Sequence, residues 1–183
     1  CETFRPQARA VARRQLGIPD SARMALFVGR PESRKRPQWA LRAASALGLT
    51  LHFAGPGTLD GAVPLGALNR EDLAAAYSAA DLVLAPTAYE GCSFAILEAL
   101  ACRAALVTTK VGWTHDLCRA LPEAHDFVSP HNDLSAFQRH AENVLSGGAD
   151  GAILDASVYI RTSMTLDRFG AEWIKAIEAV LKP

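Results

Sequence analysis

The sequence predicts an open α/β domain built on a doubly wound parallel sheet. Short apolar runs alternate with longer amphipathic segments along the chain. Runs this short and this uniformly apolar are typical of strands covered on both faces, as in a parallel sheet between two helix layers. With 183 residues, half of them hydrophobic, the chain fits one domain with a substantial core. The alternation of strands and helices therefore indicates a doubly wound domain.

The elements are predicted in chain order from these patterns. The strands are expected at residues 25–28, 50–54, 62–65, 81–85, 105–108 and 125–128. Helices are expected at residues 37–47, 69–79, 93–102, 134–145 and 166–181. Asn69 caps the second helix, with Asp72 placed to close a capping box, and Thr165 caps the last. Phe169 and Trp173, four residues apart on the last helix, are expected to pack in the core.

The charge balance and hydropathy argue against several classes of partner. Nineteen basic and nineteen acidic side chains cancel, which gives no case for a nucleic acid as main partner. No apolar run approaches the roughly 20 residues of a membrane-spanning helix, so no transmembrane segment is expected. We also expect no metal ion, because no acidic pair suits a divalent cation.

The four cysteines predict neither a zinc site nor a redox motif. Cys1, Cys92, Cys102 and Cys118 form no Cys-x-x-Cys pair, and no histidine stands at zinc-finger spacing from them. Cys92 and Cys102 lie in an apolar stretch and are expected to act as small core hydrophobes. A reducing cytosol is the simplest compartment for this usage.

Glycines, cations and a carboxylate follow the predicted strands. These segments are residues 29–36, 55–57, 86–93 and 108–112. In open α/β sheets, ligands bind beyond the carboxyl ends of the strands. The four segments therefore predict a site for an anionic ligand with a hydroxyl-rich part at one edge of the sheet.

Glu98 is the one polar residue between Phe94 and Cys102. A carboxylate in so apolar a helix is costly to bury without a strong partner. Ribose hydroxyls that donate to the carboxylate are one such partner, and a buried ion pair with an Arg or Lys is the other. The residues alone leave both interpretations open. Gly91 allows a close backbone approach, and the helix that follows begins with amides that attract phosphate.

Arg30 and Lys35 are spaced to bring two cations onto a diphosphate. Arg34 and Arg36 stand beside them, so the segment is also compatible with an ordinary solvated basic loop.

Four motifs in order resemble the C-terminal, donor-binding domain of the family 4 glycosyltransferases, which have the two-Rossmann-domain architecture called GT-B. The motifs are Arg14-Gln15-Leu16-Gly17-Ile18 after Phe4-Arg5-Pro6, Phe27-Val28-Gly29-Arg30 with Lys35, Leu65-Gly66-Ala67-Leu68 followed by Tyr77-Ser78-Ala79-Ala80-Asp81, and Glu90 with Glu98. The last pair matches the Glu-x7-Glu signature of many retaining members. The resemblance implies one donor-binding domain over residues 1–183, with 1–20 as a linker-derived segment and the acceptor-binding N-terminal domain absent.

The resemblance also implies roles for individual residues. Arg30 and Lys35 would hold the diphosphate of a UDP-sugar or GDP-sugar and stabilise the leaving nucleoside diphosphate without a metal or other cofactor. Glu90 would face the transferred sugar and Glu98 would accept hydrogen bonds from the ribose. The other donor-binding positions implied are Gly29, Ala67, Leu68, Gly91, Cys92, Ser93 and Phe94.

The chain departs from the family pattern beside this site. Cys92 and Ser93 stand where Phe and Gly are usual, and Arg103 stands where Gly is usual. A left-handed backbone at Arg103 would cost roughly 1 kcal/mol. The segment 111–116 replaces a more glycine-rich loop; its His115 is expected to be solvated.

Three functions are compatible with these residues. The first is half of a retaining glycosyltransferase that moves a hexosyl group from a nucleotide-sugar to an acceptor, with a second Rossmann-like domain as partner. The second is a non-catalytic nucleotide or sugar binding module, and the third is half of a nucleotide-sugar epimerase. The expected location is cytoplasmic, with the inner membrane surface reached only through a domain outside this chain.

Overall fold

The computed structural model describes residues 3–181 and contains a six-stranded parallel sheet. The strands are β1 (Met24–Val28), β2 (Thr50–Ala54), β3 (Val63–Gly66), β4 (Leu82–Ala85), β5 (Leu106–Thr109) and β6 (Val128–Ser129). Their order across the sheet is β3-β2-β1-β4-β5-β6. The strand order reverses between β1 and β4, which places the topological switch point there.

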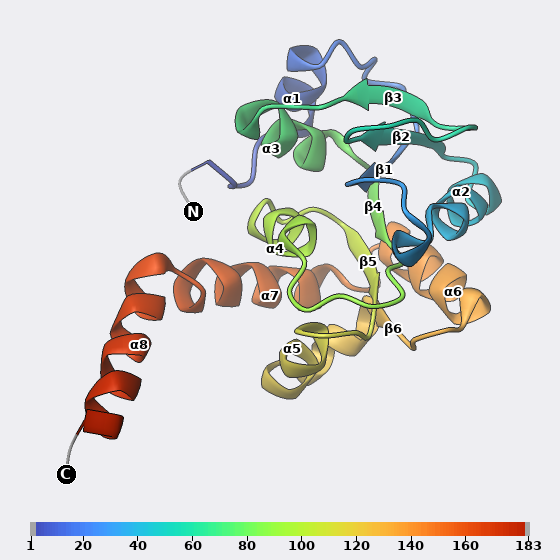
Figure 1. Cartoon of the computed structure of the whole chain (residues 1–183). Coiled ribbons are helices and arrows are strands. Elements are labelled where there is room, and N and C mark those ends of the chain that lie inside the picture. Colours follow the sequence, from blue (N-terminus) through green and yellow to red (C-terminus); the bar gives the residue numbers. More distant parts are fainter. Residues whose placement is uncertain (1–2, 182–183) are drawn as a thin grey trace.

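Helices cover the sheet on both faces (Figure 1). They are α1 (Arg9–Gln15), α2 (Pro37–Ala46), α3 (Arg70–Ala79), α4 (Phe94–Ala101), α5 (Thr114–Ala120), α6 (Leu134–Leu145), α7 (Asp150–Ser163) and α8 (Leu166–Leu181). Two 3-10 turns, η1 (Ser33–Lys35) and η2 (Pro122–Asp126), lie between them. Helices α2 and α6 pack together on one face, and α3 packs against α1 and α4 on the other, with α7 beside α4.

The core lies between the sheet and these two helix layers. Strand residues Leu26, Phe27, Phe53, Leu84 and Leu106 are all at most 1% exposed. This burial is the main favourable contribution to folding. The predicted fold class is therefore confirmed.

Strand β3 departs from the prediction that every strand is covered on both faces. It is an edge strand, and Val63 and Pro64 are exposed. Pro64 has no amide hydrogen to donate, and proline is tolerated at a sheet edge because one side of the strand needs no partner.

The last predicted strand, residues 125–128, is wrong at its start. His125 and Asp126 belong to the 3-10 turn η2, which begins at Pro122, and only Val128 and Ser129 pair with β5. Proline at the first position of the turn fixes φ near the helical value and favours that turn over an extended strand.

Three helices were not among the predicted elements. Helix α1 lies within the segment 1–20, α5 begins at Thr114 inside the segment expected to be a loop, and α7 follows the glycine pair at 147–148. Helix α7 contains Gly151 and four β-branched residues, a composition of low intrinsic helix propensity. Its packing on α4 stabilises it instead.

Helix α8 extends away from the sheet at the end of α7 (Figure 1). Thr165 Oγ1 accepts a hydrogen bond from the Arg168 amide at 3.2 Å, so the predicted cap is confirmed. Phe169 and Trp173 are more than half exposed and contact each other edge to face. The prediction that they pack in the core is wrong: the spacing gave one apolar face, but that face lies outside the body of the domain.

Candidate functional site

The loop after β1 carries the predicted diphosphate cations. Gly29 adopts φ +115°, a conformation that residues with a Cβ rarely adopt, and its amide donates to the Ala54 carbonyl at 2.9 Å. The chain then forms the turn η1 and enters α2 through Arg36, which has a left-handed φ of +47°. The sharp turn brings Lys35 back over the carboxyl edge of the sheet.

Glu90 is the anionic centre of this edge. Its Oε2 accepts from Lys35 Nζ at 2.5 Å and from Arg34 Nη1 at 2.9 Å. Arg34 Nε also donates to Glu32 at 2.9 Å. The structure thus brings together two residues predicted to act on the donor, Lys35 and Glu90, and adds Arg34 to them.

Arg30 does not meet Glu90. Its side chain is 68% exposed and lies 3.7 Å from a carboxylate oxygen of Glu32. An exposed pair of this length contributes little to stability. The Arg30 side chain is therefore available for a ligand, while Arg34 occupies the position beside Lys35.

The two cations change the acidity of Glu90. Burial alone would raise its pKa, but the hydrogen bond from Lys35 and the charges of Lys35 and Arg34 outweigh burial, so the pKa lies below its ordinary value. Glu90 is thus an ionised carboxylate at neutral pH.

Hydrogen bonds tie the site loops to one another. The Ala88 amide donates to the Arg34 carbonyl at 2.6 Å, and the hydroxyl of buried Thr87 reaches the same carbonyl at 3.2 Å. Thr109, at the end of β5, donates its hydroxyl to the Thr87 carbonyl at 2.5 Å. These bonds fix the loops after β1, β4 and β5 against each other, so the charged side chains start from a rigid frame.

Gly112 lets the loop after β5 approach the Glu90 segment closely. It has φ +52°, and a Cβ there would lie 1.9 Å from the Glu90 carbonyl oxygen. The next residue, Trp113, donates its amide to the Gly91 carbonyl at 2.7 Å. Glycine is required at this position both by conformation and by space.

The segment 91–94 leads from Glu90 into α4. Ser93 is the N-cap residue and is buried, but its side chain makes no capping hydrogen bond. Cys92 is exposed, so the prediction that it packs in the core is wrong, whereas Cys102 is buried as predicted. Phe94 is 76% exposed at the first position of α4. Cys92 lies in the loop ahead of the helix, which explains why the apolar neighbours do not cover it.

Glu98 lines a cavity of about 290 Å³ between α4, α7 and the N-terminal segment. The hydroxyl of Tyr77 donates to Glu98 Oε2 at 3.1 Å. Among residues 3–181, Glu98 takes part in no salt bridge. Of the two partners left open by the sequence, the ion pair is therefore not formed in the described part of the chain.

Burial and the polar neighbours of Glu98 shift its pKa in opposite directions. Burial raises its pKa, and the Tyr77 hydrogen bond and the charge of Arg70 lower it, with burial the larger effect. Arg70 also lies over the ring of Phe4, which lines the same cavity. The cavity thus offers one carboxylate, one guanidinium and apolar walls, a combination suited to a nucleoside.

The predicted base-side residues lie in the loop between β3 and α3. Ala67 is exposed and Leu68 is half-buried. Asn69, directly after them, accepts from the Asp72 amide at 2.8 Å, which confirms the predicted cap of α3. The cap orients the loop beside Arg70, the first residue of α3.

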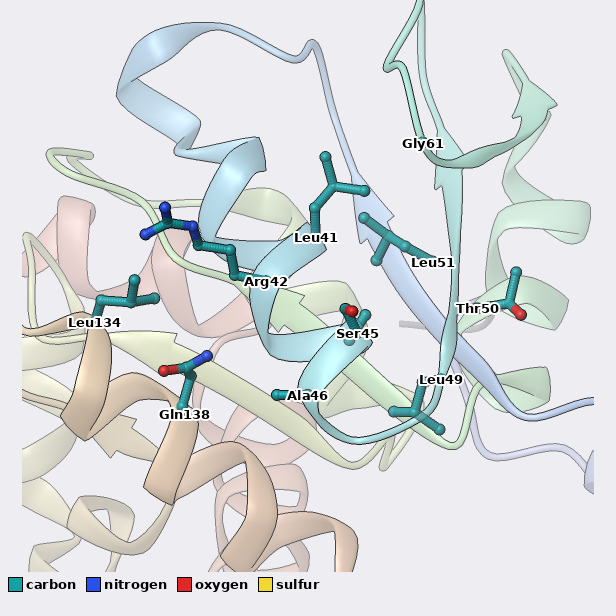
Figure 2. A pocket seen from close by; sticks show the side chains of 11 residues that line it. Leu41, Arg42, Ser45, Ala46, Leu49, Thr50, Leu51, Gly61, Leu134 and Gln138 are labelled. Atoms are coloured by element: carbon teal, nitrogen blue, oxygen red, sulfur yellow. The ribbon is translucent and has the colours of Figure 1, made fainter.

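A hollow of about 850 Å³, larger than the cavity beside Glu98, lies between α2, β2 and α6 (Figure 2). Leu41 and Arg42 of α2, Leu51 of β2 and Gln138 of α6 are among the residues that line it. None of the predicted site residues contributes to it.

Two residues that depart from the family pattern have these positions in the structure. Arg103 has φ +54°, so it adopts the left-handed backbone that would cost roughly 1 kcal/mol. His115 is exposed, as expected, although it lies on α5 and not in a loop.

Comparison with known proteins identifies the family. The family model for glycosyl transferases group 1 matches residues 22–147. The chain belongs to this family. A D-inositol 3-phosphate glycosyltransferase of Saccharomonospora viridis is 35% identical over 139 residues, which cover 61% of this chain and 32% of the relative. The chain spans about a third of the length of that relative.

Solved structures share the fold of this chain. Sucrose-phosphate synthase of Thermosynechococcus elongatus superposes with a TM-score of 0.79 at 22% identity, over 97% of this chain and 51% of that one. The C-terminal domain of a group 1 glycosyl transferase, LpcC, of Francisella tularensis superposes with a TM-score of 0.72 at 16% identity. The match covers 90% of this chain and 97% of that one. The resemblance to the C-terminal domain of a GT-B glycosyltransferase is confirmed.

Sequence reasoning missed two contacts of the site. Arg34 stands in a run of cations, and nothing in that run marks the one that meets a carboxylate. Tyr77 stands out in the sequence only as part of a motif. A tyrosine in an alanine-rich helix next to a lone carboxylate in an apolar helix is a signal that could have paired them, since α3 and α4 are in contact.

Proposed function

We propose that this domain binds the nucleotide-sugar donor of a retaining glycosyltransferase that transfers a hexosyl group to an acceptor. The observation that carries the proposal is the arrangement along α4. The charged cluster of Lys35, Arg34 and Glu90 lies at the loop before the helix, and the cavity with Glu98 lies along the helix itself. A nucleoside diphosphate needs such an arrangement: cations for the phosphates beside a partly apolar cavity for the nucleoside.

Each part of the donor has a proposed partner. Lys35 and Arg30 hold the diphosphate and neutralise the charge that develops on it as the glycosidic bond breaks. The backbone of 91–94, at the N-terminus of α4, contacts phosphate and sugar hydroxyls. Glu90 faces the sugar, Glu98 accepts from the ribose, and the backbone at Ala67 and Leu68 meets the base. Two lysine or arginine charges stabilise the leaving group in this scheme, so no metal ion is required.

The acceptor is proposed to bind a second Rossmann-like domain, distinct from the one sheet that residues 3–181 form. The match to the C-terminal domain of a group 1 enzyme supports this division. We propose a cytoplasmic location with UDP-sugar or GDP-sugar as donor. No helix within residues 3–181 is long and apolar enough to cross a membrane.

A thermal-shift experiment tests the proposal. UDP, GDP and ADP are each added with EDTA present, at about 100 times the dissociation constant where binding is found. Such a ligand stabilises the folded state by about 2.7 kcal/mol. For a domain of this size, each kcal/mol raises the melting temperature by roughly 2–4 °C, so we expect a rise of roughly 5–10 °C.

The matched control is Lys35→Ala, which removes the cation nearest Glu90 and should abolish most of the shift. The absence of a shift with all three nucleotides would contradict the proposal. A shift that requires Mg²⁺ would contradict the metal-free part alone.

A further inference from the structure

Arg34 differs from the other arginines of its loop in what it contacts. Its guanidinium and the Lys35 ammonium both donate to one oxygen, Oε2 of Glu90. Arg30 lies only near Glu32, to which Arg34 also donates, and Arg36 stacks on Trp39. The cation that shares an anion with Lys35 is therefore Arg34.

The backbone of Arg34 is fixed by the fold, and its side chain bonds to Glu32 and Glu90. Its carbonyl accepts from the Ala88 amide at 2.6 Å and from the Thr87 hydroxyl at 3.2 Å, so the loops after β1 and β4 are joined at this residue. The side chain is 32% exposed, against 68% for Arg30. A pre-positioned guanidinium loses less conformational freedom when it binds than a free one.

The oxygen that Arg34 and Lys35 share resembles a phosphate oxygen in charge and in the donors around it. An oxygen of this kind, held by one guanidinium and one ammonium, is the arrangement that a diphosphate oxygen needs. Glu90 thus accepts from both cations, and Glu32 accepts a second bond from Arg34. A diphosphate that reaches them must take over these hydrogen bonds, which leaves the Glu90 carboxylate free for another donor.

We propose that Arg34 is a diphosphate-binding residue, and that Glu90 is the internal anion that holds Arg34 and Lys35 in place until the diphosphate replaces it. This inference rests on the proposed function, because it assumes a nucleoside diphosphate at this edge. It adds a third cation to Lys35 and Arg30. It also gives Glu90 a role before the sugar is in place.

The proposal predicts opposite effects for the two sides of the ion pair. Arg34→Gln should weaken binding of the nucleoside diphosphate by roughly tenfold, the contribution of a charge-assisted hydrogen bond. Arg34→Lys keeps a charge and should lose less than about threefold. Glu90→Gln removes the competing anion, so it should tighten binding of the same nucleoside diphosphate by at least about threefold.

The experiment is calorimetric titration of the whole chain with UDP, GDP and ADP in EDTA, followed by the matching monophosphate of the one that binds tightest. The variants are Arg34→Gln, Arg34→Lys and Glu90→Gln. Arg119→Gln is the control for net charge, because Arg119 is exposed and, within residues 3–181, pairs only with Asp116 on its own helix. The monophosphate should bind Arg34→Gln nearly as well as it binds the unchanged protein.

Two results would overturn the inference while leaving the proposed function intact. One is a nucleoside diphosphate that binds the unchanged protein and Arg34→Gln equally well. The other is a Glu90→Gln variant that binds it more weakly, which would make Glu90 a scaffold for the cations. If no nucleotide binds the unchanged protein, the proposed function itself fails. Circular dichroism melts of each variant establish that the measured protein is folded. If Arg34→Gln does not fold, Arg34→Lys is the variant that is measured in its place.

Discussion

The two edges of the sheet each hold a carboxylate between two cations, yet the partners differ in kind. At the amino edge, Asp81 accepts from Arg13 at 2.9 Å and Arg9 at 2.5 Å. At the carboxyl edge, Glu90 accepts from Arg34 and Lys35 at nearly the same distances. The two carboxylates are equally exposed, at 18% and 19%. Distance and burial alone do not separate a structural ion pair from a functional one.

The difference lies in what else the groups hold. Asp81 also accepts from the Met24 amide at 2.8 Å, at the start of β1, and Arg13 donates to the carbonyls of Ala79 and Asp20. These bonds join α1, α3 and two strands. Lys35 and Glu90 bond each other through side chains at the tips of two loops. An ion pair bonded to backbone on several elements supports the fold, whereas one between loop side chains can exchange partners.

The largest effect should follow from breaking the amino-edge cluster. Asp81→Ala leaves buried Arg13 without its counter-charge, and breaking such a pair costs about 3 kcal/mol or more. The melting temperature should fall by roughly 6–12 °C. The control is Asp116→Ala, which loses only an exposed pair with Arg119 and should change stability by less than about 0.5 kcal/mol.

Asp81→Ala should affect stability without affecting nucleotide binding. Below its lowered melting temperature, the variant should bind a nucleoside diphosphate as the unchanged protein does. A large loss of affinity with little loss of stability would reverse the roles assigned to the two edges.

The next effect concerns Glu98, where nucleotide affinity should fall while the stability of the fold is kept, the reverse of Asp81→Ala. Glu98→Gln keeps the size of the side chain and an acceptor for Tyr77 but removes the charge. Hydrogen bonds to charged acceptors contribute roughly 1.5–3 kcal/mol, against about 1 kcal/mol for neutral ones. Affinity for the nucleotide should therefore fall by about tenfold. Glu123→Gln, a change of the same charge at an exposed position, should leave affinity unchanged.

The smallest effect is predicted for Tyr77→Phe, which keeps the buried ring and removes one hydroxyl. Tyr77 and Arg70 on α3 lower the pKa of Glu98, while burial raises it. Without the hydroxyl the pKa of Glu98 rises further, so the carboxylate is protonated at a higher pH. Nucleotide affinity measured from pH 8 to pH 5 should then begin to fall at a higher pH than in the unchanged protein.

Tyr159→Phe on α7 is the control, since Tyr159 is half-buried and Glu98 does not bond it. An unchanged pH profile in Tyr77→Phe would mean that Tyr77 does not act on a carboxylate that the nucleotide senses.

The sequence predicted the sheet well because its signals are local. Each central strand is an apolar run with a glycine, proline or threonine behind it, and Asn69 and Thr165 cap their helices through residues three positions away. Glu98 could be singled out for the same reason, as the one polar residue in an apolar helix.

The features that the sequence did not predict depend on partners that are distant in the chain. Helix α1 is stabilised by Arg13, whose counter-charge lies 68 residues later, and no pattern near residue 13 reveals it. The contact of Arg34 with Glu90 joins residues 56 apart through flexible side chains. Phe169 and Trp173 have the spacing of a core face, but spacing does not say whether a partner lies opposite.

In the proposed function, the nucleoside lies against Glu98 with its ribose on the carboxylate. Calorimetric titration at pH 8 of the unchanged protein and Glu98→Gln, each with the tightest-binding nucleoside diphosphate and its 2′,3′-dideoxy analogue, tests this placement. We expect the unchanged protein to prefer the ribose form by roughly tenfold and Glu98→Gln to lose most of that preference. An equal preference in both proteins, with a lower melting temperature for Glu98→Gln, would show that Glu98 is a structural residue and that the ribose binds elsewhere.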